Sequence, residues 1–433
     1  MSRARVSGPF MDGPGSAAAN TPELADVITR LSQRSKTGMV LGLDRMERVL
    51  EALGRPERAY RIAHVVGSNG KGSTCAFLAS ISSHRFRVGL YTSPHLVKLT
   101  ERVQWVSNHE FEPMSEHDFA AALERVESID SELTFFEWVT AAALLAFRDG
   151  GAELVVLEAG LGARLDATRA AHAEVAVVTD LSLEHTEILG QTIEEIAAEK
   201  AAAIRPRTPV VIAGGAGESV LRARAQSLGS PCFGIGKEIS VEWNDEGLDL
   251  ALPDRRISGV ELGLAGTHQG RNAVLAASAA VLMDPVLDEV ALRQGLSRTQ
   301  WPGRLQSFGA GPALLIDGAH NVQGAQILAE HLRSKYSNRS ITLVFGALGG
   351  KRADEMLRML VPLAERVILT RANNPRSEDP MGLVSVAGAT AEVVMPAKDA
   401  LLRALGVSGG GLIVVSGSLY LVGELLPEIL AFD

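Results

Sequence analysis

The stretch that decides the fold reads HVVGSNGKGST, from His64 to Thr74. An apolar run ends in a glycine-rich loop with a lysine, and the helical run CAFLASISSHRF follows. This order is typical of a phosphate-binding loop, because the amide groups at the start of such a helix face an anion. The spelling departs from the usual G-x-x-x-x-G-K-[ST], since an extra glycine separates Lys71 from Ser73. A glycine-rich turn without a ligand is the alternative, but the order of elements favours nucleotide binding.

Outward from this loop, short apolar runs alternate with alanine-rich helical stretches, which is typical of a parallel sheet with crossover helices. The runs are nearly continuous in hydrophobicity, as expected of strands covered on both faces. The predicted strands of the first part are 61–67, 88–93, 153–160, 174–180 and 209–214. Residues 237–265 read as short strands and turns, and a helix is expected at 270–283. After WPGRLQ the alternation restarts with ALLIDG, a helix from Asn321 to about Tyr336, ITLVFG, RVILTR, AEVVMP and GLIVVSG.

The 433 residues are too many for one ordinary core and suggest about two or three domains. We predict an α/β protein with a parallel-sheet P-loop domain at 21–300 and a smaller Rossmann-like α/β domain at 301–433. Residues 1–20 are rich in Gly, Pro, Ala and Ser and lack the apolar core of a secretory signal, so we expect a disordered tail.

The composition of the chain argues against a nucleic-acid-binding, disulfide-rich or membrane-spanning protein. The net charge of −9 argues against a general nucleic-acid binder, which would be basic. The two cysteines, Cys75 and Cys232, are too few for a disulfide framework and favour the cytoplasm. One uncharged run, 404–423, is long enough to span a membrane. Glycines interrupt it, so we expect a turn beside a short buried strand and no membrane partner.

Polar residues follow three further predicted strands: Ser93 in YTSPHL, Glu158 in VVLEAG and His185 in LSLEHTEILG. Ligands of an open parallel sheet bind outside the carboxyl ends of its strands. A carboxylate that ends an apolar run needs a positive partner, and Mg²⁺ is the natural one beside a triphosphate. The structural alternatives are a turn serine, an ion-paired or capping glutamate and a satisfied histidine.

Lys200 lies on the apolar stripe of the predicted helix TIEEIAAEKAAAI, four residues after Ile196 and four before Ile204. Thr192 and Glu195 form a capping-box pattern that marks the helix start. A lysine on such a stripe snorkels to solvent, pairs with an acid or loses its proton, because burial disfavours the charged form. A neutral amine can take up CO₂ and become a carbamate.

A series of motifs follows in order along the chain: LGLDRMERVLEALG, HVVGSNGKGST, YTSPHLVKLTERV, TFFEWVTAAALLAF, EAGLGARLDAT, EHTEILGQTIEEIAAEK, GTHQGRNAVLA, WPGRLQ, IDGAHN and GSLYLVGE. Together they resemble the folylpolyglutamate synthase/dihydrofolate synthase family of the Mur ligase superfamily, from about Thr37 to Leu426. The family spells its phosphate loop with the extra glycine.

The resemblance implies a role for each matching residue. It implies ATP contacts at Ser68, Asn69, Gly70, Lys71, Gly72, Ser73, Asn272, Arg304, Asp317 and His320. Its magnesium ligands would be Ser93, Glu158 and His185, with two ions and a carbamylated Lys200, and its catalytic residues would be Lys71, Lys200 and His185. The pterin side would be formed by Asp44, Thr134, Phe136, Arg164 and Asp166.

Several positions depart from the family pattern. Ala163 stands where the family usually has Gly, Arg169 where it has Asn, and Glu184 where it has Asp. Gly350, Lys351 and Arg352 replace an Asp-Lys-Asp run, and Val322 replaces a Pro. No phosphate or metal ligand is lost. Ala163 and Arg169 border the expected folate side, so the departures bear on substrate preference.

The implied reaction is ATP-dependent amide formation through an acyl phosphate, with L-glutamate and either dihydropteroate or a reduced folate as substrates. The resemblance also brings the expectation of a cytoplasmic monomer. Three alternatives stand beside it. A different Mur-type ligase would carry a loop without the extra glycine, and a GTPase-like switch would need an N-K-x-D motif, which this sequence lacks. A homologue that only binds would have lost ligand positions. Whether the chain adds the first glutamate, the later ones or both stays open.

Overall fold

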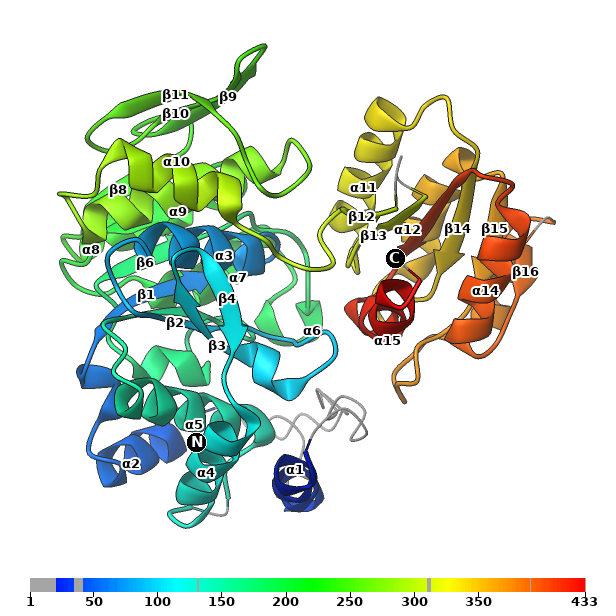
Figure 1. The fold of residues 1–433 in the computed structure, drawn as a ribbon. Coiled ribbons are helices and arrows are strands. Elements are labelled where there is room, and N and C mark those ends of the chain that lie inside the picture. The colour runs from blue at the N-terminus through cyan, green and yellow to red at the C-terminus, as the bar shows by residue number, and fades with distance from the viewer. Residues whose placement is uncertain (1–20, 35–41, 131, 310–312, 390, 433) are drawn as a thin grey trace. The chain divides into compact units, whose positions relative to one another are not determined.

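The computed structural model describes residues 21–34, 42–130, 132–309, 313–389 and 391–432. The chain divides into two compact units, Met1–Trp301 and Pro302–Asp433, coloured blue to yellow-green and yellow to red in Figure 1. The sequence placed this division between residues 300 and 301. The tail expected at 1–20 lies outside the described residues.

The first unit is built on a sheet with the strand order β4-β3-β2-β5-β1-β6-β7-β8. Six strands run parallel: β1 (Arg61–Val66), β2 (Val88–Tyr91), β5 (Leu154–Glu158), β6 (Val175–Val178), β7 (Val210–Ile212) and β8 (Cys232–Gly234). The predicted parallel sheet is therefore confirmed for β1, β2, β5, β6 and β7, whereas β8 was not predicted. The prediction missed the edge hairpin of β3 (Val103–Ser107) and β4 (Glu110–Pro113), which pairs antiparallel to β2. The residues of β4 are largely exposed, so this strand carries no continuous apolar run.

Alternate residues of the central strands face two cores, as the period of a strand requires. Ala63 and Val65 face α3 (Lys71–Ser82), α9 (Gln269–Met283) and α10 (Glu289–Arg298). Ile62 and Val155 face α1 (Pro22–Arg34), α2 (Asp44–Ala52), α4 (Glu116–Glu127) and α5 (Phe135–Asp149). Figure 1 shows α3, α9 and α10 on one side of the sheet and α2, α4 and α5 on the other. Both faces of the strands are thus buried, which explains their unbroken hydrophobicity.

Shorter elements complete the first unit. After β6 come α6 (Thr186–Leu189), α7 (Ile193–Lys200) and the 3₁₀ turn η5 (Ala201–Ala203), and α8 (Glu218–Ser227) precedes β8. The 3₁₀ turns η2 (Pro56–Arg58), η3 (Leu99–Arg102) and η4 (Ala167–Ala170) lie in connections. An antiparallel sheet of β9 (Ser240–Asn244), β10 (Gly247–Ala251) and β11 (Arg256–Val260) packs on α9.

The second unit holds a six-stranded sheet of order β12-β13-β17-β14-β15-β16. Its parallel strands are β13 (Leu314–Ile316), β14 (Ile341–Phe345), β15 (Arg366–Leu369), β16 (Ala391–Val393) and β17 (Leu412–Ser416), and β12 (Gln306–Phe308) is antiparallel to β13. Helices α11 (Val322–Lys335), α12 (Ala353–Leu360) and α13 (Val384–Ala387) cover one core, and α14 (Ala397–Val407) and α15 (Leu419–Leu430) pack on β14 and β17. The connections include η6 (Val361–Leu363) and η7 (Pro380–Leu383).

The uncharged run 404–423 contains the buried strand β17 between two helices. Among the described residues, no helix combines the length and the hydropathy needed to span a membrane.

Candidate functional site

The glycine-rich loop connects the end of β1 to the first residue of α3, which is Lys71. The backbone of Gly70 has a φ of +86°, and a Cβ there would lie 2.2 Å from Oδ1 of Asn272. A Cβ on Gly67 would lie 1.8 Å from Oγ1 of Thr179. Both positions therefore require glycine, and the loop fits closely between the end of β6 and helix α9.

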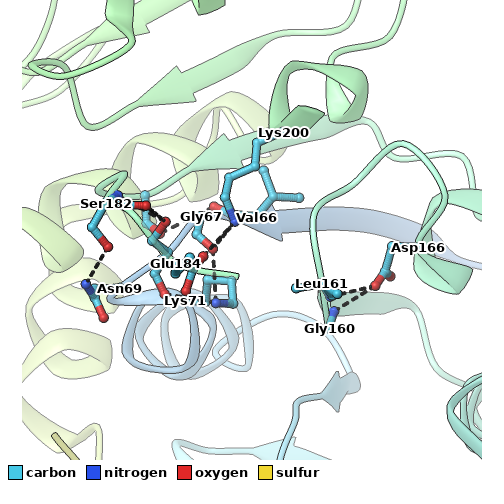
Figure 2. Close-up of polar contacts among 12 residues, drawn as sticks. Val66, Gly67, Asn69, Lys71, Gly160, Leu161, Asp166, Ser182, Glu184 and Lys200 are labelled. Atoms are coloured by element: carbon cyan, nitrogen blue, oxygen red, sulfur yellow. Dashed lines mark hydrogen bonds and ion pairs between the residues drawn. The ribbon is translucent and has the colours of Figure 1, made fainter. Parts of the chain in front are cut away.

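Hydrogen bonds from one neighbouring strand end hold the loop in place. The amides of Ser68 and Asn69 donate to the carbonyl of Asp180, at 3.0 and 3.2 Å. The Ser182 amide donates to Oγ of Ser68 at 3.1 Å, and the Asn69 side chain donates to the Ser182 hydroxyl (Figure 2). Sequence reasoning missed Asp180, although it directly follows the apolar run of a strand.

A salt bridge joins Asp180, which holds the loop, to helix α9. Arg271 donates to Asp180 at 2.7 Å and to the carbonyl of Ala213 at 2.8 Å, so it ties the ends of β6 and β7 together. The adjacent Asn272 is buried and is bonded to Gln269 and Thr74. In this structure the side-chain groups of Asn272 have partners inside the protein, and the residue packs against the loop.

Two lysines meet at the loop (Figure 2). The Nζ of Lys71 donates to the carbonyls of Gly67 and Ser68, at 3.0 and 3.1 Å. The Nζ of Lys200 donates to the same Gly67 carbonyl at 2.7 Å and lies 3.0 Å from Oε1 of Glu184. Lys200 is only 2% exposed, so its side chain does not snorkel to solvent. Of the three structural outcomes considered for it, the structure shows pairing with an acid.

The pair of Lys200 and Glu184 has shifted titration behaviour. Burial lowers the pKa of the Lys200 amine from its ordinary value, although the Glu184 carboxylate opposes this. Burial alone would raise the pKa of Glu184, but the charges of Lys200 and Lys71 outweigh it and lower this pKa to about 2. Both effects follow from taking charges out of water and placing opposite charges together.

Ser93 and Glu158 lie at the ends of the neighbouring strands β2 and β5. The Ser93 amide donates to Oε2 of Glu158 at 3.0 Å, and Glu158 is buried. A hydroxyl and a carboxylate are oxygen ligands of the kind Mg²⁺ prefers, and Mg²⁺ keeps several waters or phosphate oxygens besides. The two residues therefore fit a magnesium ion that is completed by non-protein ligands.

His185 begins α6 with a φ of +46°, and its Nδ1 lies 3.9 Å from Oε1 of Glu187. In the part of the chain that the structure describes, no three His, Cys, Asp or Glu side chains gather closely enough to hold a metal ion.

The expected pterin-side residues gather around the start of α5. Thr134 caps this helix and forms a capping box with Glu137, whose carboxylate also accepts two hydrogen bonds from Arg45, at 2.8 and 3.1 Å. Arg45 lies in the LGLDR motif directly after Asp44, the first residue of α2. The Phe136 ring packs against Tyr91. A Cβ on Gly160 would lie only 2.6 Å from this ring, so the ring packs directly on Gly160. Residues 35–41 of this region lie outside the described residues.

Two further pterin-side candidates have partners within the protein. Asp166 is buried and accepts hydrogen bonds from the amides of Gly160 and Leu161, at 3.0 and 2.9 Å (Figure 2). It also accepts hydrogen bonds from the amide and the hydroxyl of Thr168. Burial raises its pKa from the ordinary value, and these hydrogen bonds oppose the shift. Arg164 is exposed and paired with Glu199 at 2.8 Å, so in this structure it does not line a buried wall.

The candidates of the second unit gather at the end of β13. Asp317 is half-buried there and accepts hydrogen bonds from the amides of Leu305 and Ala319, each at 2.9 Å. Burial raises the pKa of Asp317, and the charge of Arg304 opposes this shift. The Nδ1 of His320 lies 2.9 Å from the carbonyl of Gly318. Arg304, Asp317 and His320 thus belong to one loop region of this unit.

Comparison with known families assigns both units. The Mur ligase middle domain matches residues 65–280, and the glutamate ligase domain of Mur ligases matches residues 303–419. The fold and the phosphate loop therefore define a Mur ligase. A dihydrofolate synthase/folylpolyglutamate synthase of Bacillus subtilis (strain 168) is 32% identical over 428 residues, which cover 93% of this chain and 98% of the relative.

Solved structures agree with this relationship. FolC of E. coli, solved in complex with DHPP and ADP, matches with a TM-score of 0.88 and 29% identity, over 94% of this chain and 98% of that one. The Yersinia pestis c092 bifunctional folylpolyglutamate synthase/dihydrofolate synthase, solved with AMPPNP and a Mn ion, gives a TM-score of 0.86 and 28% identity, over 94% and 97%. The chain belongs to the dihydrofolate synthase/folylpolyglutamate synthase family, as its motifs predicted.

Proposed function

We propose that this protein is an ATP-dependent ligase that joins L-glutamate to the carboxylate of dihydropteroate or of a folate. One observation carries the proposal: the glycine loop is fixed between Asp180 and Asn272, with Lys71 and the Ser93–Glu158 pair beside it. This arrangement supports a phosphate-binding loop next to a pair of side chains that could hold magnesium. The relatives that are dihydrofolate and folylpolyglutamate synthases support the same reaction.

The reaction proceeds in two balanced steps. The substrate carboxylate attacks the γ-phosphorus of ATP, which forms an acyl phosphate and releases ADP. The glutamate amine then attacks the acyl carbon, phosphate leaves and the nitrogen loses a proton. The loop amides and Lys71 would hold the phosphates and offset the charge of two approaching anions. For this, the Lys71 ammonium has to exchange the carbonyls of Gly67 and Ser68 for phosphate oxygens.

Ser93 and Glu158 would hold one magnesium ion, and His185 would help to hold a second. Such an ion would neutralise phosphate charge during the transfer. The Glu158 carboxylate is pre-positioned for this role by the Ser93 amide.

We also propose that the Lys200 amine is converted to a carbamate in the active enzyme. Its burial and lowered pKa favour the neutral amine that CO₂ requires. The carbamate would be an anion beside Glu184, so the present pair would have to separate. Lys200→Ala should then lose activity and regain part of it with acetate or formate, whereas Lys237→Ala, an exposed lysine, should behave as wild type. Full activity of Lys200→Ala without any added carboxylate would contradict the carbamate.

On the folate side, Thr134, Phe136 and the Arg45–Glu137 pair are proposed to form the pterin wall near Asp44. Asp166 would shape that wall through the loop of Gly160 and Leu161, and Arg164 would contact substrate only after leaving Glu199.

The remaining assignments are part of the same proposal. Arg304, Asp317 and His320 are proposed as ATP contacts from the ligase unit, and the protein is proposed to work in the cytoplasm as a monomer without nucleic-acid or membrane partners.

The deciding experiment is ADP release by the purified protein with ATP, Mg²⁺ and L-glutamate, with dihydropteroate or tetrahydrofolate added in separate reactions. Turnover with both substrates would establish a bifunctional enzyme, and turnover with one would name the single activity. Glu158→Gln and Glu153→Gln form a matched pair, because the two carboxylates lie at opposite ends of β5 and only Glu158 faces Ser93. If the protein binds ATP but releases no ADP with either substrate, the folate assignment is contradicted.

A further inference from the structure

Two arginines meet between η4 and η5, outside the residues assigned above. The Nε of Arg169 donates to the carbonyl of Ala202 at 3.0 Å. A terminal nitrogen of Arg205 donates in return to the carbonyl of Arg169. The same nitrogen lies 3.5 Å from the carbonyl oxygen of Ala171. Each guanidinium is therefore held by backbone next to the other arginine, so two positive charges share one small region.

Among the described residues, acids act on these two arginines only from a distance. Among the described residues, neither Arg169 nor Arg205 has a carboxylate within ion-pair distance. The acids that influence them from farther away have other partners, since Glu199 is bonded to Arg164 and Glu47 is bonded to Arg55. The two guanidinium groups thus keep their full charge without a counterion.

Electrostatics shows that the arrangement is unfavourable as it stands. Burial lowers the pKa of the Arg205 guanidinium, and the charge of Arg169 lowers it further. Burial likewise lowers the pKa of Arg169, with Arg224 of α8 as the next cause. Burial and Arg205 also lower the pKa of His172. Half-buried like charges repel strongly because water screens them less than at the surface.

We propose that Arg169 and Arg205 form a binding site for a phosphate-type oxyanion. The guanidinium fork suits such a ligand, because it offers two parallel N–H groups to two oxygens. Only the Nε of Arg169 is engaged among the described residues, which leaves its terminal nitrogens for the ligand.

The competing explanation is that both arginines only satisfy carbonyl groups at the ends of two 3₁₀ turns. That role accounts for the hydrogen bonds, but a neutral donor would fill it without placing a second charge beside Arg205. The two explanations differ in one measurable respect, which is a response to phosphate that depends on Arg169.

The test is phosphate binding by the whole protein, measured by calorimetry and by thermal unfolding at pH 7.5. Saturating AMPPNP and Mg²⁺ keep phosphate out of the glycine loop. The measurement is repeated with Lys71→Ala, in which phosphate binding by that loop is weakened. All four tryptophans lie in the first unit, so tryptophan fluorescence follows this unit's unfolding. Sodium chloride at equal ionic strength and glutarate, a dicarboxylate, are the comparison salts.

We expect phosphate to raise the unfolding temperature more than chloride does, and Arg169→Asn to weaken phosphate binding by at least about tenfold. The control is Arg61→Asn, because Arg61 also bonds a backbone carbonyl but is paired with Glu174. It should leave phosphate binding unchanged. Equal responses to phosphate and chloride in the wild type, a response to glutarate alone, or unchanged binding in Arg169→Asn would each overturn the proposal. Ligase activity does not enter this test, so its outcome is independent of the proposed function.

Discussion

The Nζ of Lys200 lies 3.0 Å from Oε1 of Glu184, and both side chains are almost entirely shielded from water. The same Nζ donates to the carbonyl of Gly67, the first residue of the phosphate loop. A buried ion pair therefore connects the end of α7, the segment after β6 and the nucleotide cradle.

Removal of Glu184 should destabilise the first unit. Glu184→Ala would leave the Lys200 charge buried without its acid, which costs about 3 kcal/mol in such pairs. Glu184→Asp should retain most of the stability, since the carboxylate is kept. Urea unfolding followed by tryptophan fluorescence measures this unit alone. The exposed Glu187 provides the control Glu187→Ala, and equal stability of the two alanine variants would show that the pair contributes nothing.

Gly70→Ala should weaken nucleotide binding strongly. The new Cβ would lie 2.2 Å from Oδ1 of Asn272, and the backbone there has a φ of +86°. Because Asn272 is fixed by its own hydrogen bonds, the loop has to move, and kcat/KM for ATP should fall by about 100-fold.

The matched control for Gly70→Ala is Gly151→Ala. Gly151 has a φ of +72° but no atom within 4 Å of the added Cβ, so it carries the backbone strain without the clash. It should lose about 1–2 kcal/mol of stability and keep its affinity for ATP. Similar ATP affinity in both variants, measured by calorimetry, would refute the steric explanation.

The strands and the loop were predictable because their signals are local. Buried parallel strands read as unbroken apolar runs, and the predicted ends of β1 and β5 lie within two residues of the observed ones. The capping box of Thr192 and Glu195 and the place of Lys200 on the apolar stripe also follow from spacing along one helix. Such features need no knowledge of distant partners.

The partners of the charged residues were not predictable, because tertiary structure selects them. Arg45 and Glu137 are 92 residues apart in sequence, and Arg271 and Asp180 are 91 apart. Asn272 was expected to contact ATP, yet its amide is bonded within the protein. Local pattern shows that a polar residue ends a strand, but not whether a ligand or a second side chain will satisfy it.

Glu158→Gln should raise the magnesium requirement. The amide keeps an oxygen that can accept the Ser93 N–H, but it loses the charge that attracts a cation. We expect the Mg²⁺ concentration for half-maximal ADP release to rise at least about tenfold, which is the scale on which altered metal surroundings act. Glu153→Gln, at the other end of β5, should leave the requirement unchanged. Equal Mg²⁺ dependence of both variants would remove Glu158 from the metal site.

His64 should make the first unit less stable in acid. It is buried in β1, and its Nε2 lies 2.8 Å from Oγ1 of Thr168. Burial, with smaller contributions from the charges of Arg205 and Arg169, lowers its pKa to about 3. The unfolded chain, with an ordinary pKa near 6.5, binds the proton first as the pH falls. The stability from this group is therefore complete above about pH 6.5 and is lost as the pH falls toward 3.

Between pH 8 and pH 5 this one group should lower the free energy of unfolding by about 2 kcal/mol. His64→Gln should be less stable at pH 8, because the packing changes, but its loss of stability between the two pH values should be smaller by that amount. Urea unfolding at both pH values, followed by tryptophan fluorescence, measures the difference. His117→Gln is the control, since this histidine is exposed and should leave the wild-type pH dependence intact. The same pH dependence in His64→Gln and the wild type would mean that His64 is protonated equally in the folded and unfolded chains.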